Sequence, residues 1–323
     1  MGGWLVKALL EQGAFPVVLV RDHAPQSMFF RENLARRCAI VRGSLQDFPL
    51  LRRTLSEYSV TTVFHLAAQA IVSTAKVDPV GTLETNVQGT WNLLEACRQT
   101  KVSQILIASS DKAYGAHESL PYVESQALQG KFPYEVSKSC ADLIAGMYAT
   151  TYRLPVAVAR CANLFGGGDL NFSRLIPDLI RRTLEGRRFV IRSDGKFVRD
   201  FLYVEDAASA YLCLAEHLAN NPELMGEAFN FSMETRLTVL DLVQKILQMM
   251  GRTDLEPIVQ NSTTNEIREQ YLSIEKAHRL LSWSAQFNLE EGIRRTVAWY
   301  AEFLGANAGA EARFAKAAVD AGN

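Results

Sequence analysis

The residues best suited to chemistry are a Ser-Asp-Lys run at the end of an apolar segment and a tyrosine and a lysine further along the chain. Ser110, Asp111 and Lys112 form the run, and Tyr134 and Lys138 are four residues apart. On a helix, that spacing puts both side chains on one face. A nearby ammonium favours the ionised form of a tyrosine hydroxyl. Such a pair can remove a proton from a substrate hydroxyl while hydride leaves the adjoining carbon.

Neither motif is specific when it stands alone. A tyrosine and a lysine four residues apart occur on many helices as an ordinary surface pair. The combination is more specific, because active sites of doubly wound sheets lie at the carboxyl ends of the strands. For Asp111 and Lys112, the alternative interpretation is a helix cap followed by a solvated charge. His65 lies inside an apolar segment and is interpreted as a packed histidine.

Five short apolar runs, rich in β-branched residues, predict strands that are buried on both faces. They cover residues 16–20, 38–43, 60–68, 103–110 and 155–161. Helical patterns at 48–58, 82–100 and 134–152 alternate with them, and the chain opens on a helical pattern that ends at Gly13. This alternation predicts an α/β fold with a Rossmann-like parallel sheet that is wound on both sides.

The change of pattern along the chain predicts two unequal lobes. After Cys161 the alternation gives way to glycine- and arginine-rich segments. A dinucleotide-binding domain is expected at 1–160 plus about 197–218, and a smaller α/β substrate lobe at 161–196 plus about 219–304. The alanine-rich residues 305–323 are expected to form a tail that is a frayed helix or disordered.

Composition and charge argue against several classes of function. The formal net charge is -1, so no global field attracts nucleic acid or an anionic membrane. We expect no membrane span, because no apolar run is long enough. Lys7 and Glu11 interrupt the opening segment where a signal peptide would stay apolar. The five cysteines are scattered singly, which favours reduced thiols, no structural metal and a cytoplasmic location.

Together these residues resemble the extended branch of the short-chain dehydrogenase/reductase family, the NAD-dependent epimerases and dehydratases. Ser110, Tyr134 and Lys138 are similar to its catalytic triad. HLAAQ at 65–69 and TNVQGT at 85–90 resemble its cofactor-side segments. The resemblance covers nearly the whole chain and implies NAD as the cofactor. The positions at which it implies cofactor binding are Gly2, Arg21, Asp22, Ser44, Leu45, Leu66, Ala67, Ala68, Gln69, Asn86, Tyr134 and Lys138.

Three later segments resemble the parts of that family that bind the nucleotide sugar. They are RCANLFGGGD at 160–169, RLIPDLI at 174–180 and RDFLYVEDA at 199–207. A buried pyrophosphate needs hydrogen-bond donors and positive charge, which favours Asn163 and Arg199 as substrate ligands. Arg174 and Arg268 are further candidates, each of which could equally be a surface arginine.

The pair after Ser110 points to one activity within the family. Epimerases usually carry a small or apolar pair there, whereas 4,6-dehydratases carry an acid followed by Glu or, in CDP-glucose dehydratases, by Lys. Here the pair is Asp111 and Lys112. Loss of water across C5 and C6 of a 4-keto sugar needs an acid for the departing hydroxyl and a base for the C5 proton. The resemblance therefore implies an NDP-hexose 4,6-dehydratase, closest to the CDP-glucose type.

Two alternatives stay open. A 4-epimerase or 4-keto reductase of the same family needs the triad but not the acid and the base. A non-catalytic nucleotide-sugar or cofactor-binding protein is the alternative from another class. The resemblance also implies a homodimer, formed through a four-helix interface by the helices near 86–100 and 134–152.

The chain departs from the family pattern around the cofactor. The family's first strand and TGxxGFxG loop are expected to be missing, because the sequence opens at what resembles the last glycine of that loop, Gly2 or Gly3. A misplaced start is the simplest explanation. An acid usually ends the second strand, but here Arg21 precedes Asp22, so NADP stays an alternative to NAD. Ser44 stands where the family usually has an Asp near the adenine.

Overall fold

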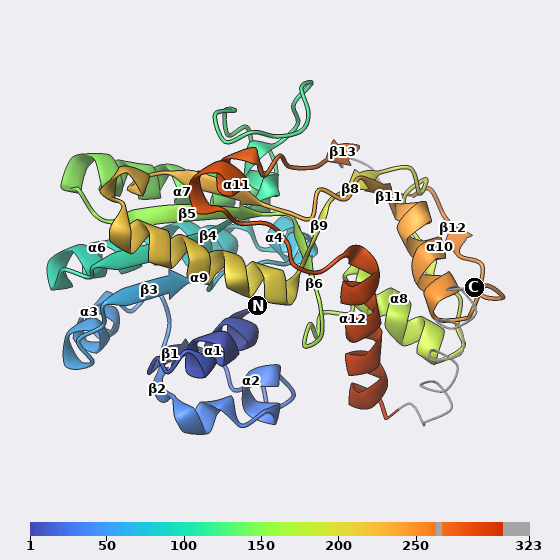
Figure 1. Ribbon diagram of the computed structural model, residues 1–323, viewed down its shortest axis with the longest axis horizontal. Helices are drawn as coiled ribbons and strands as arrows, with labels where there is room; N and C mark the ends of the chain where they lie inside the picture. Colours follow the sequence, from blue (N-terminus) through green and yellow to red (C-terminus); the bar gives the residue numbers. More distant parts are fainter. Residues whose placement is uncertain (263–266, 306–323) are drawn as a thin grey trace. The chain divides into compact units, whose positions relative to one another are not determined.

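The computed structural model describes residues 1–262 and 267–305, which form two compact units (Figure 1). The first unit consists of Met1–Ala162, Glu205–Ser232 and Leu272–Ser284. The second consists of Asn163–Val204, Met233–Tyr271 and the described residues from Ala285 on. From residue 306 on, the expected tail lies outside the described residues. The assignment of one lobe to the dinucleotide and the other to the sugar stays a prediction.

The first unit contains a four-stranded parallel sheet in the order β10-β5-β4-β3. Its strands are β3 (Thr62–His65), β4 (Gln104–Ser110), β5 (Val156–Cys161) and β10 (Ala228–Phe231). All of β5 is buried, as expected for an apolar strand with helices on both faces. The sheet confirms the predicted α/β fold. β10 was not among the predicted strands, because AFNF contains no β-branched residue.

Two further strands, β1 (Val17–Val20) and β2 (Ala39–Arg42), form a parallel sheet of their own. Among the described strands, β1 pairs only with β2, and β3 pairs only with β4. In the Rossmann strand order, the break falls between the second and fourth strands, at the position of the first. The expectation that β1, β2 and β3 are buried on both faces is wrong. In β3 only His65 is fully buried. All of β1 is half-buried and Arg42 of β2 is exposed, because only one edge of β1 has a neighbouring strand in the described chain.

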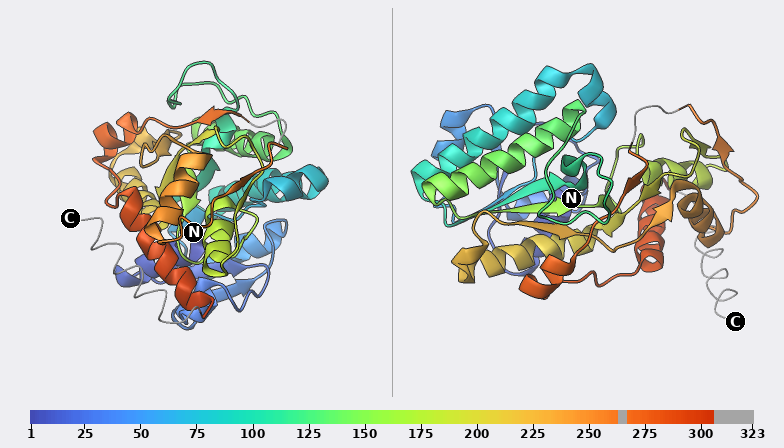
Figure 2. Two further views of the ribbon diagram at one scale, coloured as in Figure 1. Left: turned by 90° about the vertical axis from the view of Figure 1, so that its right-hand side faces the viewer. Right: turned by 90° about the horizontal axis from the view of Figure 1, so that it is seen from above.

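Helices cover both faces of the four-stranded sheet, with α6 (Gly89–Thr100) and α7 (Pro133–Tyr152) on one face and α9 (Val204–Asn220) on the other (Figure 2). α7 matches the predicted helix at 134–152 almost exactly in extent, and α3 (Phe48–Glu57) matches that at 48–58. Asp47 starts α3 by accepting a hydrogen bond from the backbone N–H of Leu50. The helix predicted at 82–100 is divided into α5 (Pro79–Leu83), a π-helical turn η2 (Glu84–Gln88) and α6.

The other helical elements of the first unit are short, except for the first. They are α1 (Gly2–Glu11), α2 (Met28–Arg31), η1 (Leu34–Arg37), α4 (Val72–Val77), η3 (Asp111–Tyr114), η4 (Pro222–Leu224) and α11 (Glu275–Leu281). η1, η3 and η4 are 3₁₀ turns. No helix in the described part of the chain is long and apolar enough to cross a membrane.

The core of the first unit lies between the sheet and helices α3, α6 and α7. Its side chains are almost entirely removed from water and include Leu94, Cys97, Ile105, Ile107, Val156 and Val158. A smaller cluster around Leu10, Phe29 and Leu34 packs beneath β1 and β2. The candidates from Ser110 to Lys112 therefore lie at the end of a strand whose interior residues are firmly packed. The strands β1 and β2 have a smaller core of their own.

The described residues of the second unit form short strands and three helices. The parallel pair is β6 (Asn163–Phe165) with β9 (Phe201–Tyr203), and β7 (Val190–Ile191) pairs with β12 (Ile258–Val259). β8 (Val198–Arg199) lies between β11 (Leu237–Thr238) and β13 (Glu269–Gln270). The helices are α8 (Leu175–Leu184), α10 (Val239–Met249) and α12 (Leu289–Phe303). A Cβ at Gly167 would lie 2.4 Å from the ring of Trp299, so only glycine allows α12 this close.

Candidate active site and cofactor site

The carboxyl end of β4 carries the first catalytic candidates. Ser110 is the last residue of the strand, and its hydroxyl donates a 2.9 Å hydrogen bond to Oδ1 of Asp111. Asp111 is 1% exposed, and its Oδ2 has no hydrogen-bond partner among the described residues. Lys112 is half-buried on the same turn, η3. A buried carboxylate with an unused oxygen is costly for the fold, so a ligand group is a natural partner for it.

Tyr134 and Lys138 both lie on α7, as their spacing predicted, and both are buried. Pro133 starts the helix, where its missing N–H is not needed. The ammonium of Lys138 donates a 2.7 Å hydrogen bond to the backbone carbonyl of Ala108 in β4. Burial lowers the pKa of Lys138 to about 8, although the negative charge of Asp142 acts in the opposite direction. Its proton is therefore held weakly enough to exchange near neutral pH.

Two hydrogen bonds hold α7 against the strand and turn that carry Ser110 to Lys112. One is the bond from Lys138 to β4, and the other runs from the hydroxyl of Ser139 to the carbonyl of Ala113, at 2.9 Å. The structure thus brings the elements that carry all five catalytic candidates together in the first unit. Their roles in a reaction stay a prediction.

The cofactor-side segments after β3 are joined by one buried side chain, Asn86. Its Oδ1 accepts from the backbone N–H of Gln69 at 2.7 Å, and its amide donates to the carbonyl of Gln69 and to the hydroxyl of Ser137 on α7. Asn86 therefore fixes the loop after β3 against the catalytic helix. Leu66 and Ala68 in this loop are half-buried and Ala67 is exposed.

His65, at the end of β3, is a packed histidine. It is 5% exposed and bonds the hydroxyl of Thr90 at 2.9 Å. Burial, together with the charge of Lys138, lowers its pKa to about 3. The ring is therefore neutral at physiological pH.

The remaining cofactor candidates follow β1 and β2 or start α1. Arg21 and Asp22 are exposed and form an ion pair with each other at 2.6 Å. The hydroxyl of Ser44 bonds the side-chain carbonyl of Gln46. The side chain of Leu45 belongs to the hydrophobic core, so only its backbone is left to meet a ligand.

The residues present fit the dinucleotide that the sequence implies. Gly2 opens α1 and a Cβ there would meet no atom within 4 Å, so its backbone can approach a phosphate closely. The first N–H groups of a helix have no partner inside it and favour anions. In β4, the hydroxyl of Ser109 is buried without a described partner. Lys138 uses one of its three donors on Ala108, which leaves donors for a ribose hydroxyl.

The four substrate candidates lie in the second unit, where two of them share one aromatic ring. The guanidinium groups of Arg199 and Arg268 lie 5.2 Å and 5.9 Å from the ring centre of Phe197. Arg199 also donates to the backbone carbonyl of Arg268 at 3.1 Å. The structure therefore brings these two arginines together, and Arg268 also pairs with Asp194.

The other two substrate candidates have different partners. The amide of Asn163 donates to the carbonyl of Asp200 at 2.9 Å and so ties β6 to β9. Arg174, at the start of α8, forms an ion pair with Asp169 at 2.8 Å. The binding of substrate by any of the four stays a prediction.

Sequence reasoning missed two groups that touch the catalytic elements. Ser137 bonds Asn86, and Asp142 forms a buried ion pair with Arg160 of β5. A signal for Asp142 was present, because it follows Lys138 by four residues and so lies on the same face of α7. No spacing rule links it to Arg160.

The sequence profile of the NAD dependent epimerase/dehydratase family matches residues 1–231. The chain is 30% identical over 318 residues to CDP-glucose 4,6-dehydratase of Salmonella typhimurium, and the match covers 94% of this chain and 88% of that protein. It is also 30% identical over 302 residues to dTDP-glucose 4,6-dehydratase 1 of Escherichia coli, covering 84% and 82% of the two chains.

Solved structures share the fold. A dTDP-glucose 4,6-dehydratase from Streptomyces venezuelae, crystallised with NAD, superposes with a TM-score of 0.83 at 27% identity and covers 96% of each chain. A UDP-glucose 4-epimerase from Thermotoga maritima, crystallised with UDP-glucose, gives 0.84 at 28% identity and covers 94% of this chain and 96% of its own. Profile, sequences and structures agree, and the chain belongs to the NAD dependent epimerase/dehydratase family.

Proposed function

We propose that this protein is an NDP-hexose 4,6-dehydratase, of the kind that acts on CDP-glucose. The observation that carries the proposal is the Ser110-Asp111-Lys112 turn, held against the helix of Tyr134 and Lys138. Its Asp111 is buried, and Oδ2 of Asp111 has no described partner. Oxidation at C4 needs the serine, the tyrosine and the second lysine. The acid and the base are needed only if water is then lost. The similarity to CDP-glucose and dTDP-glucose 4,6-dehydratases supports the same activity.

In the proposed reaction, Ser110 holds the C4 oxygen of the hexose and Tyr134 removes the proton of the C4 hydroxyl. NAD bound beside these residues would supply the hydride acceptor for C4 and, once reduced, the hydride donor for C6. Lys138 favours the ionised form of Tyr134 and holds the nicotinamide ribose. Lys112 takes the C5 proton, and Asp111 gives a proton to the hydroxyl that departs from C6 as water. When hydride is then added at C6, Lys112 returns its proton to C5, which completes the product. The 2.9 Å bond between Ser110 and Asp111 keeps the acid next to the residue that orients the sugar.

The nucleotide part of the substrate is proposed to bind in the second unit. Arg199 and Arg268 supply two positive charges held by one aromatic ring, which suits a pyrophosphate. Asn163 and Arg174 are the further ligands in this proposal.

The test is incubation of the protein and NAD, without added reductant, with CDP-glucose, dTDP-glucose and UDP-glucose in parallel. The expected product is lighter than its substrate by one water, and CDP-glucose is expected to react fastest. A product of unchanged mass with inverted C4 stereochemistry would establish the epimerase instead. Tight binding of a nucleotide sugar with neither change, and with no NADH formed, would establish the non-catalytic alternative.

We also propose that the protein forms a homodimer in the cytoplasm, through α6 and α7. Large apolar side chains on these helices remain exposed in the single chain, with Trp91 at 44%, Leu143 at 64% and Met147 at 43%. Exposed large apolar side chains on neighbouring helices are the kind of surface that a partner covers in an interface. The scattered thiols favour the cytoplasm.

A further inference from the structure

Arg160, on β5, is a buried cation with an unusually complete set of partners. It is 6% exposed. Its Nε and Nη2 donate to the two carboxylate oxygens of Asp142 at 2.8 Å and 2.9 Å, a bidentate arrangement. Its Nη1 donates to the hydroxyl of Tyr114 at 2.9 Å and to the carbonyl of Glu124 at 3.1 Å. Burial alone would lower the pKa of Arg160, but the bonds and charge of Asp142 outweigh it and raise the pKa.

The two side chains that Arg160 joins belong to the two catalytic elements. Asp142 lies on α7, four residues after Lys138 and eight after Tyr134, so all three share one face of the helix. Tyr114 ends η3, the turn that begins at Asp111. A single planar group therefore bonds the helix that carries the tyrosine and the turn that carries the acid.

The far side of Tyr114 is also fixed. Its hydroxyl donates to Oδ1 of Asn230 on β10 at 2.7 Å, and its ring stacks on that of Tyr122 with centres 4.8 Å apart. The guanidinium of Arg160 lies 4.9 Å from the centre of the Tyr114 ring. These contacts fix Tyr114 to β10 and to Tyr122, so Arg160 bonds α7 to a side chain of η3 whose own position is set.

We propose that Arg160 is a positioning residue for the reaction, which sets Tyr134 and Lys138 on α7 against Ser110, Asp111 and Lys112 by bonding Asp142 and Tyr114 at once. This inference rests on the proposed function. It assigns Arg160 no contact with substrate or cofactor. A displacement of about 1 Å between reacting groups can lower a rate about 100-fold, so loss of this link is expected to lower kcat by about 10- to 100-fold.

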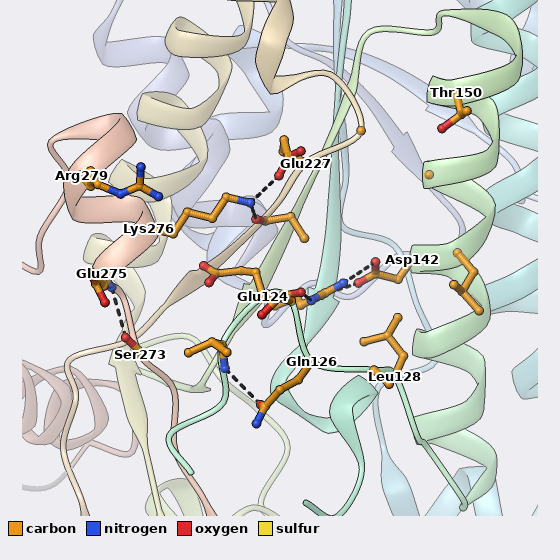
Figure 3. Close-up of a pocket in the computed structure, with 18 residues that line it drawn as sticks. Glu124, Gln126, Leu128, Asp142, Thr150, Glu227, Ser273, Glu275, Lys276 and Arg279 are labelled. Atoms are coloured by element: carbon orange, nitrogen blue, oxygen red, sulfur yellow. Dashed lines mark hydrogen bonds and ion pairs between the residues drawn. The ribbon is translucent and has the colours of Figure 1, made fainter. Parts of the chain in front are cut away.

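Arg160 also lines a pocket of about 800 Å³ at the surface of the first unit, which makes a rescue experiment feasible. Figure 3 shows Asp142 on the α7 side of this pocket, with Glu227 bonded to Lys276 across from it. When the side chain of Arg160 is removed, a small guanidinium ion can enter from solvent and reach the carboxylate of Asp142. Methylguanidinium has the planar donor arrangement that a lysine lacks.

The first measurement needs no substrate. Hydrogen–deuterium exchange is compared for the unaltered protein, Arg160→Lys and Tyr114→Phe. Tyr114→Phe is the milder change and serves if Arg160→Lys folds poorly. Leu94→Ala, a core change on α6 away from the link, is the control for general destabilisation. Faster exchange at both 111–114 and 133–142 in either link variant, beyond that in Leu94→Ala, is expected. The proposal is overturned if faster exchange is confined to β5, or if exchange at 111–114 and 133–142 is no faster than in Leu94→Ala. Either outcome is decisive whatever the protein's activity is.

The second measurement is kinetic, at saturating NAD. Arg160→Ala is expected to lower kcat for dehydration about 10- to 100-fold and to change KM for the nucleotide sugar less than about threefold, with partial recovery of kcat in millimolar methylguanidinium. Leu94→Ala is expected to keep its kcat and to show no rescue. An unchanged kcat in folded Arg160→Ala refutes the positioning role. Failure of the unaltered protein to form NADH or product refutes the proposed function instead, and the exchange data then decide on Arg160 alone.

Discussion

Replacement of Lys138 by methionine is expected to stabilise the protein while abolishing its activity. The ammonium of Lys138 is buried, and its pKa is lowered from 10.5 to about 8 because burial disfavours the charged form. At about 1.4 kcal/mol per pH unit, this difference corresponds to roughly 3 kcal/mol of folding free energy lost at pH 7. Methionine removes that penalty but leaves the carbonyl of Ala108 without its donor, which costs about 1–2 kcal/mol. The expected net gain at pH 7 is about 1–2 kcal/mol.

The pH dependence of this gain has a definite sign. Between pH 8 and 10.5 the unfolded chain keeps the proton of Lys138 while the folded chain loses it. Because the unfolded state binds more protons in this window, the stability of the unaltered protein rises with pH there, relative to the variant. The advantage of Lys138→Met should therefore shrink from pH 7 to pH 9.5, by about 2 kcal/mol.

The assay is urea unfolding of the two proteins at both pH values, because groups common to both cancel in the difference. Lys131→Met, at an exposed lysine of the same unit, is the control and is expected to show no such trend. An equal difference between Lys138→Met and the unaltered protein at pH 7 and pH 9.5 would show that the Lys138 ammonium carries no burial penalty, and the reasoning would fail.

Three further outcomes are expected. Asp111→Asn should lower the rate of water loss by about 100- to 10,000-fold while NADH formation at C4 persists, as seen by absorbance and product mass; equal loss of both steps would contradict its role as the acid. Leu143→Glu combined with Met147→Glu should convert a dimer to a monomer in sedimentation velocity. If the unaltered protein is already monomeric at micromolar concentration, the proposed dimer is contradicted. Adding a strand and a TGxxGxxG loop before Met1 should tighten NAD binding and raise Tm together, whereas equal NAD affinity in titrations of both versions would contradict the cofactor argument.

The catalytic helix and the strand end before it could be predicted because their signals are local. The apolar run before Ser110 and the four-residue spacing of Tyr134 and Lys138 both follow from the periodicity of a single element, and both motifs lie on the elements that the pattern indicated. The substrate candidates were less predictable, since the sharing of Phe197 by Arg199 and Arg268 joins segments far apart in the sequence.

Other features had no local signal. β10 was missed because its sequence AFNF contains no β-branched residue. The π-helical turn inside 82–100 was missed because it leaves the apolar periodicity unchanged. The link from Arg160 to Asp142 and Tyr114 spans 18 and 46 residues. Such pairs arise from how β5, α7 and η3 pack, which spacing along one element does not encode.

The costly features of the first unit gather at one place, and that is itself an argument for function. Ser109 and Asp111 each bury an oxygen without a described partner, and Lys138 keeps a charge in a site that disfavours it. All three lie at the carboxyl end of β4 or bond it, whereas the preceding residues of that strand belong to a core of tightly packed aliphatic side chains. A sequence under selection for stability alone would have replaced them, because apolar residues of similar size would remove each penalty. Their retention is explained if these groups gain their missing partners when cofactor and sugar bind.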